Sequence, residues 1–193
     1  AAGKIECLVL LGADPLSDVP DADLARRGIS GARNIIAIDT FITQSSALAD
    51  IVLPAAAYGE KEGTTTNLEG RISNVAQSIT PVGTSRPDWM IAVELGAATS
   101  HDLGFASYSE VNAAMISGVN EFAPAADTHA VEHDGVLIAH PTPITLTRAD
   151  GASIERNSYD YRAVVSRKLY DNALGTAKSP SLATLAPSAA VIV

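Results

Sequence analysis

Two histidines in this sequence stand at a spacing that zinc enzymes use. His129-Ala130-Val131-Glu132-His133 matches the H-x-x-E-H pattern of inverted zinc proteases. Such a site needs a helix that places both imidazoles on one face, together with a third ligand. Pro124 lies shortly before the pattern and Asp134-Gly135 follows it directly, so a rigid helix has little room. We therefore predict an acidic surface loop at these residues.

The turn Gly12-Ala13-Asp14-Pro15 follows a predicted buried strand. Open α/β sheets bind ligands at the carboxyl ends of their strands, where this turn would lie. One glycine falls short of the GxGxxG fingerprint, and the chain contains no Walker A sequence. An ordinary strand-to-helix turn is the favoured interpretation, with a phosphate or dinucleotide contact as the alternative. Residues 39–43, after the next predicted strand, have the same geometry and the same ambiguity.

The segment from Glu60 to Arg71 is the richest in polar residues. Its carboxylates could do acid–base work, but no nucleophile or metal partner accompanies them. We predict a structured loop in which Arg71 pairs with an acid. Cys7 lies at the start of a predicted buried strand, where a cysteine is more often a small hydrophobe than a nucleophile. The residues alone identify no catalytic, cofactor-binding or metal-ligating position.

Composition and charge exclude several classes of function. The chain has 193 residues with 22 acidic and 13 basic side chains, which gives a net charge of −9. No Lys or Arg occurs between Arg86 and Arg148, so we expect no nucleic-acid partner. No apolar run approaches the length of a membrane span, so we expect no direct membrane insertion. The single cysteine excludes a disulfide framework and any Cys-ligated iron–sulfur cluster within this chain.

The first part of the chain alternates strand and helix signals. Short apolar runs at 7–11 and 34–39 are typical of strands buried in a parallel sheet, the first of them on both faces, and 50–53 is predicted as a third strand closed by Pro54. A helix at 21–27, stopped by Gly28, and a helical turn at 43–49 separate them. This order indicates right-handed crossovers in an open sheet. The predicted fold class is α/β, with a Rossmann-like parallel sheet and flanking helices.

The rest of the chain changes character. Residues 55–85 show neither the apolar periodicity of a helix nor that of a strand. We predict a helix over 86–100, capped by Ser85 or Asp88, and a second one opened by Ser109. The second helix would carry an apolar stripe of Val111, Met115, Val119 and Phe122. From Pro124 the pattern favours β structure, with strands predicted at 135–139, 144–147, 161–166 and 190–193. The chain begins without Met and stops inside an apolar run, so we expect a piece of a longer polypeptide.

The order of several segments resembles the molybdopterin oxidoreductase family, and the resemblance covers residues 5–98 and 159–187. The segments that carry it are Asp39-Thr40-Phe41-Ile42-Thr43, Ala47 to Pro54, Glu60 to Thr64, Asn67 to Arg71, and Arg86-Pro87-Asp88-Trp89. The Gly12–Pro15 turn and residues 166–171 resemble one branch, the large G-type subunit of bacterial NADH-quinone oxidoreductase, respiratory complex I.

The resemblance implies a domain organisation and a cofactor arrangement. In the family, iron–sulfur clusters and the molybdenum ligand lie upstream of this region, and a β-barrel that holds the pterin nucleotide lies downstream. Residues 1–155 would be part of the α/β domain, and residues 156–193 the truncated start of the barrel, entered at Tyr161. In the complex I branch the domain generally lacks the cofactor and serves as a scaffold in the peripheral arm.

The resemblance also implies a function. The chain would be a non-catalytic scaffold of a subunit that passes electrons from NADH through iron–sulfur clusters to quinone. Its partners would be other peripheral-arm subunits, on the cytoplasmic side of the bacterial inner membrane. No residue of this chain would be catalytic, bind a cofactor or ligate a metal.

Two alternatives remain open. The chain could belong to a molybdenum enzyme such as a formate dehydrogenase, with Gly12, Thr43 and the Gly63–Asn67 loop contacting the cofactor, or it could be an unrelated α/β domain. The sequence departs from the family's usual Thr-Glu-Thr-Ala by reading Thr43-Gln44-Ser45-Ser46-Ala47. It also carries Asp14 where cofactor-bearing members often have Asn. A carboxylate repels an anionic pyrophosphate, so this departure indicates a vestigial cofactor site.

Overall fold

The computed structural model describes residues 3–138 and 174–185. The chain divides into two compact units, Ala1–Ile144 and Thr145–Val193. Of the second unit, the described residues form helix α6 (Leu174–Lys178) and the 3-10 helix η4 (Ala183–Leu185). No helix in the described ranges combines the length and apolar character that a membrane crossing needs.

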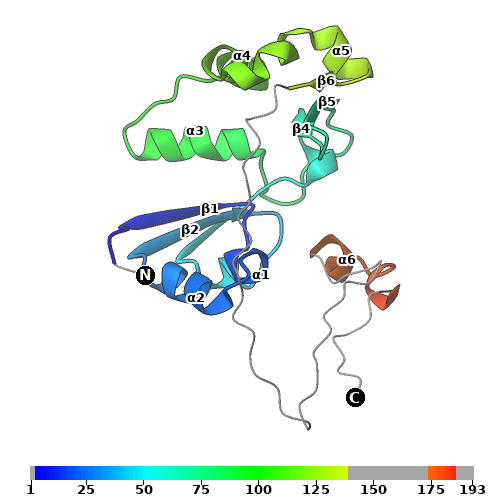
Figure 1. Cartoon of the computed structure of the whole chain (residues 1–193). Coiled ribbons are helices and arrows are strands. Elements are labelled where there is room, and N and C mark those ends of the chain that lie inside the picture. Colours follow the sequence, from blue (N-terminus) through cyan, green and yellow to red (C-terminus); the bar gives the residue numbers. More distant parts are fainter. Residues whose placement is uncertain (1–2, 139–173, 186–193) are drawn as a thin grey trace, which may run out of the picture. The chain divides into compact units, whose positions relative to one another are not determined.

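The first unit opens with a three-stranded parallel sheet (Figure 1). Its strands are β1 (Cys7–Leu11), β2 (Asn34–Asp39) and β3 (Ile51–Pro54), in the order β1-β2-β3. Leu10 pairs in register with Ala37, and Ala37 pairs with Val52. Helix α1 (Pro15–Asp18) and helix α2 (Ala22–Ser30) connect β1 to β2. The predicted α/β class and parallel sheet are confirmed.

Helices lie on both faces of this sheet (Figure 1). Side chains alternate between the two faces along a strand, so neighbouring residues of β2 enter different cores. On one face Leu10, Ile35 and Ala37 pack with Ile29 of α2. On the other, Ile38 packs with Ala55 and with Ile91 of helix α3 (Asp88–Ala98).

The prediction that β1 is buried on both faces is wrong. Val9 is 50% exposed and Leu11 is 59% exposed, whereas Leu10 between them is buried. The core cluster on that face contains residues of β2, β3 and α3 but none of β1, which pairs only with β2 in the described part of the chain. Cys7 is correspondingly a free, exposed thiol rather than a buried small hydrophobe.

Two predicted helix ends also differ from the structure. Helix α2 continues through Gly28 to Ser30, because burial of Ile29 outweighs the cost of about 1 kcal/mol for an internal glycine. Neither Ser85 nor Asp88 caps α3, whose first residue follows Pro87. The Asp88 carboxylate pairs instead with Lys61.

Residues 55–85 are more regular than their composition predicts. Strands β4 (Gly63–Thr66) and β5 (Arg71–Val75) form an antiparallel hairpin, and β6 (Val136–Leu137) adds to β5. The Asn67 side-chain oxygen fixes the turn by accepting hydrogen bonds from the amides of Glu69 and Arg71, at 2.9 and 3.0 Å. A short 3-10 helix, η2 (Tyr58–Glu60), precedes the hairpin.

The prediction of β structure from Pro124 onward is wrong for the described residues up to Asp134. Helix α4 (Tyr108–Gly118) lies before Pro124, and it is followed by the 3-10 helix η3 (Asn120–Ala126), which contains Pro124, and by helix α5 (Thr128–His133). Ser107, not Ser109, caps α4, and Asp127 caps α5 by accepting from the Ala130 amide at 3.0 Å. Buried Ala125 and Val131 pack on Ile72 of β5, and this packing stabilises the helical conformation.

Only the start of one predicted later strand can be checked. β6 lies within the predicted strand 135–139, whose last residue is outside the described residues. The predicted strands at 144–147, 161–166 and 190–193 lie outside them as well, so the predicted start of a barrel at 156–193 and the boundary at residue 155 stay predictions.

Gly135 joins α5 to β6 and tests this packing. Its φ is +70°, and an added Cβ would lie 2.8 Å from the Ile72 carbonyl oxygen. We expect Gly135→Ala to reduce the free energy of unfolding by about 2 kcal/mol, measured by urea denaturation. Gly28→Ala is the matched control: open space surrounds Gly28 inside α2, so the same change should stabilise the chain by about 0.5 to 1 kcal/mol. Destabilisation of similar size in both variants would contradict the close packing that we assign to Gly135.

Candidate functional site

The carboxyl ends of β1 and β2 bring together two segments that the sequence separates. Gly12, with φ +55°, turns the chain out of β1, and its amide donates to the Ile38 carbonyl of β2 at 2.8 Å. Asp14 follows this turn. The segment after β2 contains Thr43 and Ser45, followed by the 3-10 helix η1 (Ser46–Leu48). Both predicted candidate turns therefore meet at one edge of the sheet.

The Asp14 carboxylate forms the link between these segments. Its Oδ1 accepts from the Ser45 amide at 3.0 Å and from the Ser45 hydroxyl at 2.5 Å. Its Oδ2 accepts from the Ser17 hydroxyl at 2.7 Å. The Ser45 oxygen in turn accepts from the Leu16 amide at 3.0 Å, so the start of α1 is tied to the same serine. One carboxylate thus receives three donors from both sides of the edge.

Three hydroxyl residues in the turn after β2 are buried and already paired, whereas Ser17 is exposed. Thr43 is 6% exposed, Ser45 is 0% and Ser46 is 1%. The Thr43 amide donates to the Ser46 hydroxyl at 2.7 Å, and the Ser46 amide donates to the Thr43 hydroxyl at 3.1 Å. This reciprocal pairing stabilises the tight turn after β2. Sequence analysis named Thr43 as a candidate contact but neither serine, although three hydroxyl residues within seven positions of the end of β2 were a usable signal.

The hydrogen bonds shift the acidity of Asp14. Burial raises the pKa of its carboxyl, because it removes water from the charged form. Hydrogen bonds from Ser45 and Ser17, with a smaller contribution from Thr43, lower that pKa by more, so it lies below its ordinary value of 3.8. Asp14 is therefore ionised at neutral pH.

This arrangement does not fit a phosphate-bearing group at Asp14. A phosphate there would meet a fixed negative charge, and the Ser45 amide and hydroxyl that could bind it already donate to Asp14. The Ser45 hydroxyl is paired with a carboxylate, but Ser45 is 0% exposed, so its oxygen is not accessible to a substrate. The hydrogen bonds of Asp14 instead join the segments that follow β1 and β2.

The Gly63–Asn67 segment is the other candidate from the sequence, and it forms β4 and the start of the hairpin turn. In the described residues no hydrogen bond joins it to Asp14, Thr43 or Ser45. Arg71 pairs with Glu69 at 3.9 Å, as predicted, but its guanidinium also donates to the Gly135 carbonyl at 3.0 Å. Arg71 thus attaches the hairpin to the helical segment.

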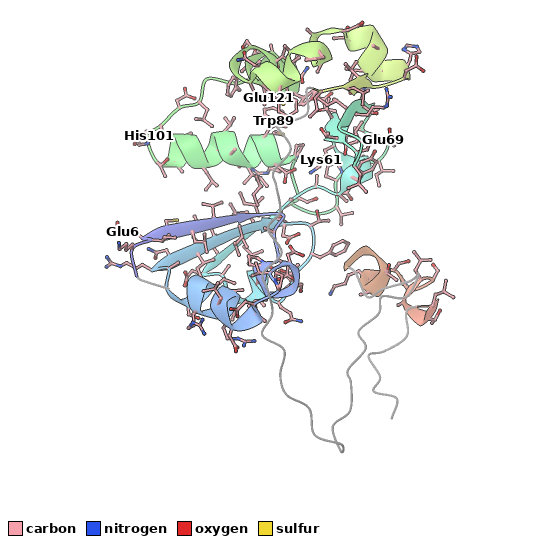
Figure 2. The ribbon with its side chains drawn as sticks, in the orientation of Figure 1. Glu6, Lys61, Glu69, Trp89, His101 and Glu121 are labelled. Carbon is pink, nitrogen blue, oxygen red and sulfur yellow. The ribbon has the colours of Figure 1, made fainter. Side chains whose placement is uncertain are left out.

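A half-open cleft of about 250 Å³ lies where α3, α4 and the start of β4 meet. Figure 2 labels Lys61 and Trp89 at this junction, and Met115 of α4 lines the cleft with them. Val111 and Met115, predicted on one stripe, both face it. Lys61 is paired with Asp88, so the described lining of the cleft offers no cation free to bind a substrate.

The histidine pattern lies on a helix and not in the predicted loop. Helix α5 ends at His133, and the Asp127 cap explains how so short a segment becomes helical. Among the described residues no group of three or more His, Cys, Asp or Glu is placed to hold a metal ion.

The lowered pKa of Asp14 makes stability depend on pH. A depressed folded-state pKa contributes stability that is fully present above the unfolded value of 3.8 and is lost as the pH falls through the folded pKa. We expect Asp14→Asn to lose about 1.5 kcal/mol relative to the native chain at pH 7, and the difference to shrink as the pH falls below 3.8. Urea denaturation at a series of pH values measures this. A difference that is independent of pH would show that the charge of Asp14 does not matter.

Parts of this chain are similar in sequence to proteins of known name. The F420-dependent formate dehydrogenase 2 subunit alpha of Methanococcus maripaludis is 32% identical over 127 residues, which cover 64% of this chain and 18% of the relative. The G-type subunit 2 of NADH-quinone oxidoreductase from Rhizobium meliloti is 46% identical over 69 residues, 36% of this chain and 8% of the relative. The chain therefore spans less than a fifth of the length of these relatives.

A solved structure and a family model also match. Acetylene hydratase from Pelobacter acetylenicus aligns with a TM-score of 0.45 and 21% identity, over 50% of this chain and 14% of that chain. The family model described as Molybdopterin oxidoreductase matches residues 1–98, which include the parallel sheet, the hairpin and α3. Because this match covers more than half of the 193 residues, the chain belongs to the molybdopterin oxidoreductase family.

Proposed function

We propose that the chain is a scaffold region in the large peripheral-arm subunit of a bacterial NADH-quinone oxidoreductase. In that enzyme, iron–sulfur clusters elsewhere in the subunit pass electrons from NADH towards quinone, and this region positions them without taking part in the chemistry. Its partners are other subunits of the peripheral arm, and it lies on the cytoplasmic side of the inner membrane. It binds no pterin cofactor.

The Asp14 cluster is the observation that carries this proposal. A region that clasps a phosphate-bearing cofactor needs free donors at the carboxyl ends of its strands. Here the Ser45 amide, the Ser45 hydroxyl and the Ser17 hydroxyl all donate to a carboxylate of the chain itself. This arrangement favours a structural role for that edge. The 46% identity to the Rhizobium meliloti NADH-quinone oxidoreductase subunit, over 69 residues, supports the same assignment.

A second candidate is the cofactor-clasping region of a molybdenum enzyme. The longer match to a formate dehydrogenase subunit, over 127 residues, favours it. Gly12 and the Gly63–Asn67 segment would then contact the cofactor. Thr43 could do so only after leaving its reciprocal bonds with Ser46, since its side chain is 6% exposed.

Metal analysis of the natively purified parent enzyme separates the two candidates. We expect iron without molybdenum, together with NADH:quinone activity in the same preparation. Near-stoichiometric molybdenum would contradict the scaffold proposal and favour the second candidate.

Substitutions in the two turns test the scaffold role itself. We expect Thr43→Ala and Asn67→Ala each to destabilise the fold by about 1 kcal/mol, because each removes hydrogen bonds that fix a turn. The amount of assembled parent enzyme should fall, while NADH:quinone turnover per assembled enzyme stays unchanged.

Gln44→Ala is the matched control. Its exposed side chain lies between Thr43 and Ser45 and makes no hydrogen bond in the described part of the chain, so assembly should not change. A loss of turnover in fully assembled Thr43→Ala or Asn67→Ala enzyme would overturn the scaffold role.

A further inference from the structure

We propose that the free edge of strand β4, together with the cleft at its start, binds an extended segment of another polypeptide. The segment carries an aromatic side chain for the cleft and a lysine or arginine beside it. This goes beyond the proposed function, which names partner subunits but no surface that binds them. It applies equally to the second candidate function, so the metal content of the parent enzyme does not test it.

Strand β4 is an edge of its sheet, because in the described part of the chain it pairs with β5 alone. The Asn67 amide donates to the carbonyl of the opposed residue Arg71 at 3.0 Å, so these two form a hydrogen-bonded pair. Such pairs alternate with non-hydrogen-bonded pairs along an antiparallel ladder. Thr64 and Thr66 therefore direct their N–H and C=O groups away from β5, where an added strand can pair with them.

The first residues of this edge line the half-open cleft of about 250 Å³. Gly63 is one of them, and a Cβ added there would meet no atom within 4 Å. Neither a positive φ nor crowding requires glycine at this position, and such a strand glycine often marks the close approach of another backbone. Trp89, Val111 and Met115 supply the apolar wall. Pockets for drug-sized ligands measure roughly 300 to 1,000 Å³, so this smaller cleft suits one large side chain.

The charges of the lining favour a cationic segment. Lys61 pairs with Asp88, so the described lining has no cation left to attract an anionic partner. Glu62 also lines the cleft, is exposed and makes no hydrogen bond or ion pair in the described residues. Helices α3 and α4, which form the other side, carry acidic residues and no lysine or arginine. A lysine or arginine two positions from the inserted side chain shares its face of the added strand and can pair with Glu62.

The wall of the cleft contains an unpaired donor. The indole N–H of Trp89 is buried and has no acceptor among the described residues. Buried polar groups in native proteins nearly always have a hydrogen-bond partner. The wall is therefore incomplete as it stands, and a backbone carbonyl of the inserted segment would complete it after a small rotation of the indole.

The indole N–H of Trp89 is also the natural reporter, because the chain has one tryptophan and so gives one indole signal in the NMR spectrum. The probe is a heptapeptide with blocked ends, threonine-lysine-threonine-phenylalanine-threonine-lysine-threonine, whose order is the same in both strand directions. Added to the full nitrogen-15-labelled chain, it should cause saturable shifts of the Trp89 indole signal and of the Thr64 and Thr66 amides. Glutamate in place of both lysines, or alanine in place of phenylalanine, should weaken binding at least tenfold.

Two variants of the chain test the edge and the charge separately. Thr64→Pro removes an amide that faces away from β5, so it should keep the fold and bind the peptide at least tenfold more weakly. Thr64→Val is the matched control, because it keeps this amide and should bind as the native chain does. Glu62→Gln should weaken binding by about threefold, as expected for an exposed ion pair. Glu6→Gln removes the same charge away from the cleft and should have no effect (Figure 2).

Three results would overturn the inference. They are the absence of saturable shifts, equal binding by Thr64→Pro and the native chain, and equal binding of the lysine and glutamate peptides. Sedimentation of the native chain examines the other occupant: a dimer that Thr64→Pro abolishes would show that a second copy covers the edge, against the proposal. If circular dichroism shows that Thr64→Pro is unfolded, Glu62→Gln and the comparison of the two peptides still decide.

Discussion

The carboxylate of Asp14 is the group on which the edge of the parallel sheet depends. Backbone hydrogen bonds hold β1 and β2 together along their length, but the segments after them run in different directions, into α1 and into the turn at Ser46. Asp14 and Ser45 join those segments, and the buried Ser45 hydroxyl would cost about 1 to 3 kcal/mol if it were left unpaired. This edge of the sheet is therefore negatively charged, and its hydrogen-bond donors are occupied by a carboxylate of the chain itself.

A second constraint links the sheet to the rest of the first unit. The Ala56 amide donates to the Arg86 carbonyl at 2.8 Å, and the Arg86 amide donates to Pro54, so the chain returns to the end of β3 after the hairpin. The chain then enters α3, which packs on the face of the sheet opposite α2. In the first turn of α3, Asp88 pairs with Lys61. Polar residues that the sequence suggested as candidates for chemistry, such as Asp14 and Asn67, therefore stabilise turns and connections between elements.

The sequence predicts the parallel sheet well because its signal is local. The continuous apolar run of β2 needs no distant partner to be recognised as a buried strand, and the predicted helix start at Asp21 differs by one residue from the observed one, because Asp21 is the N-cap of α2. The β4–β5 hairpin was missed because Gly63–Thr66 carries no apolar alternation, and its stability comes from Asn67 and from packing of Ile72. The role of Asp14 was only half predictable: its turn is visible in the sequence, but its partner Ser45 lies 31 positions away.

The titration of the Asp14 carboxyl carbon, followed by NMR in the full chain with carbon-13-labelled aspartate, tests the central claim most directly. If three donors hold an ionised carboxylate between the strand ends, the pKa of Asp14 will lie below 3.8, and Ser45→Ala will raise it. A pKa at or above 3.8 that does not respond to Ser45→Ala would show that the carboxylate does not join the strand ends.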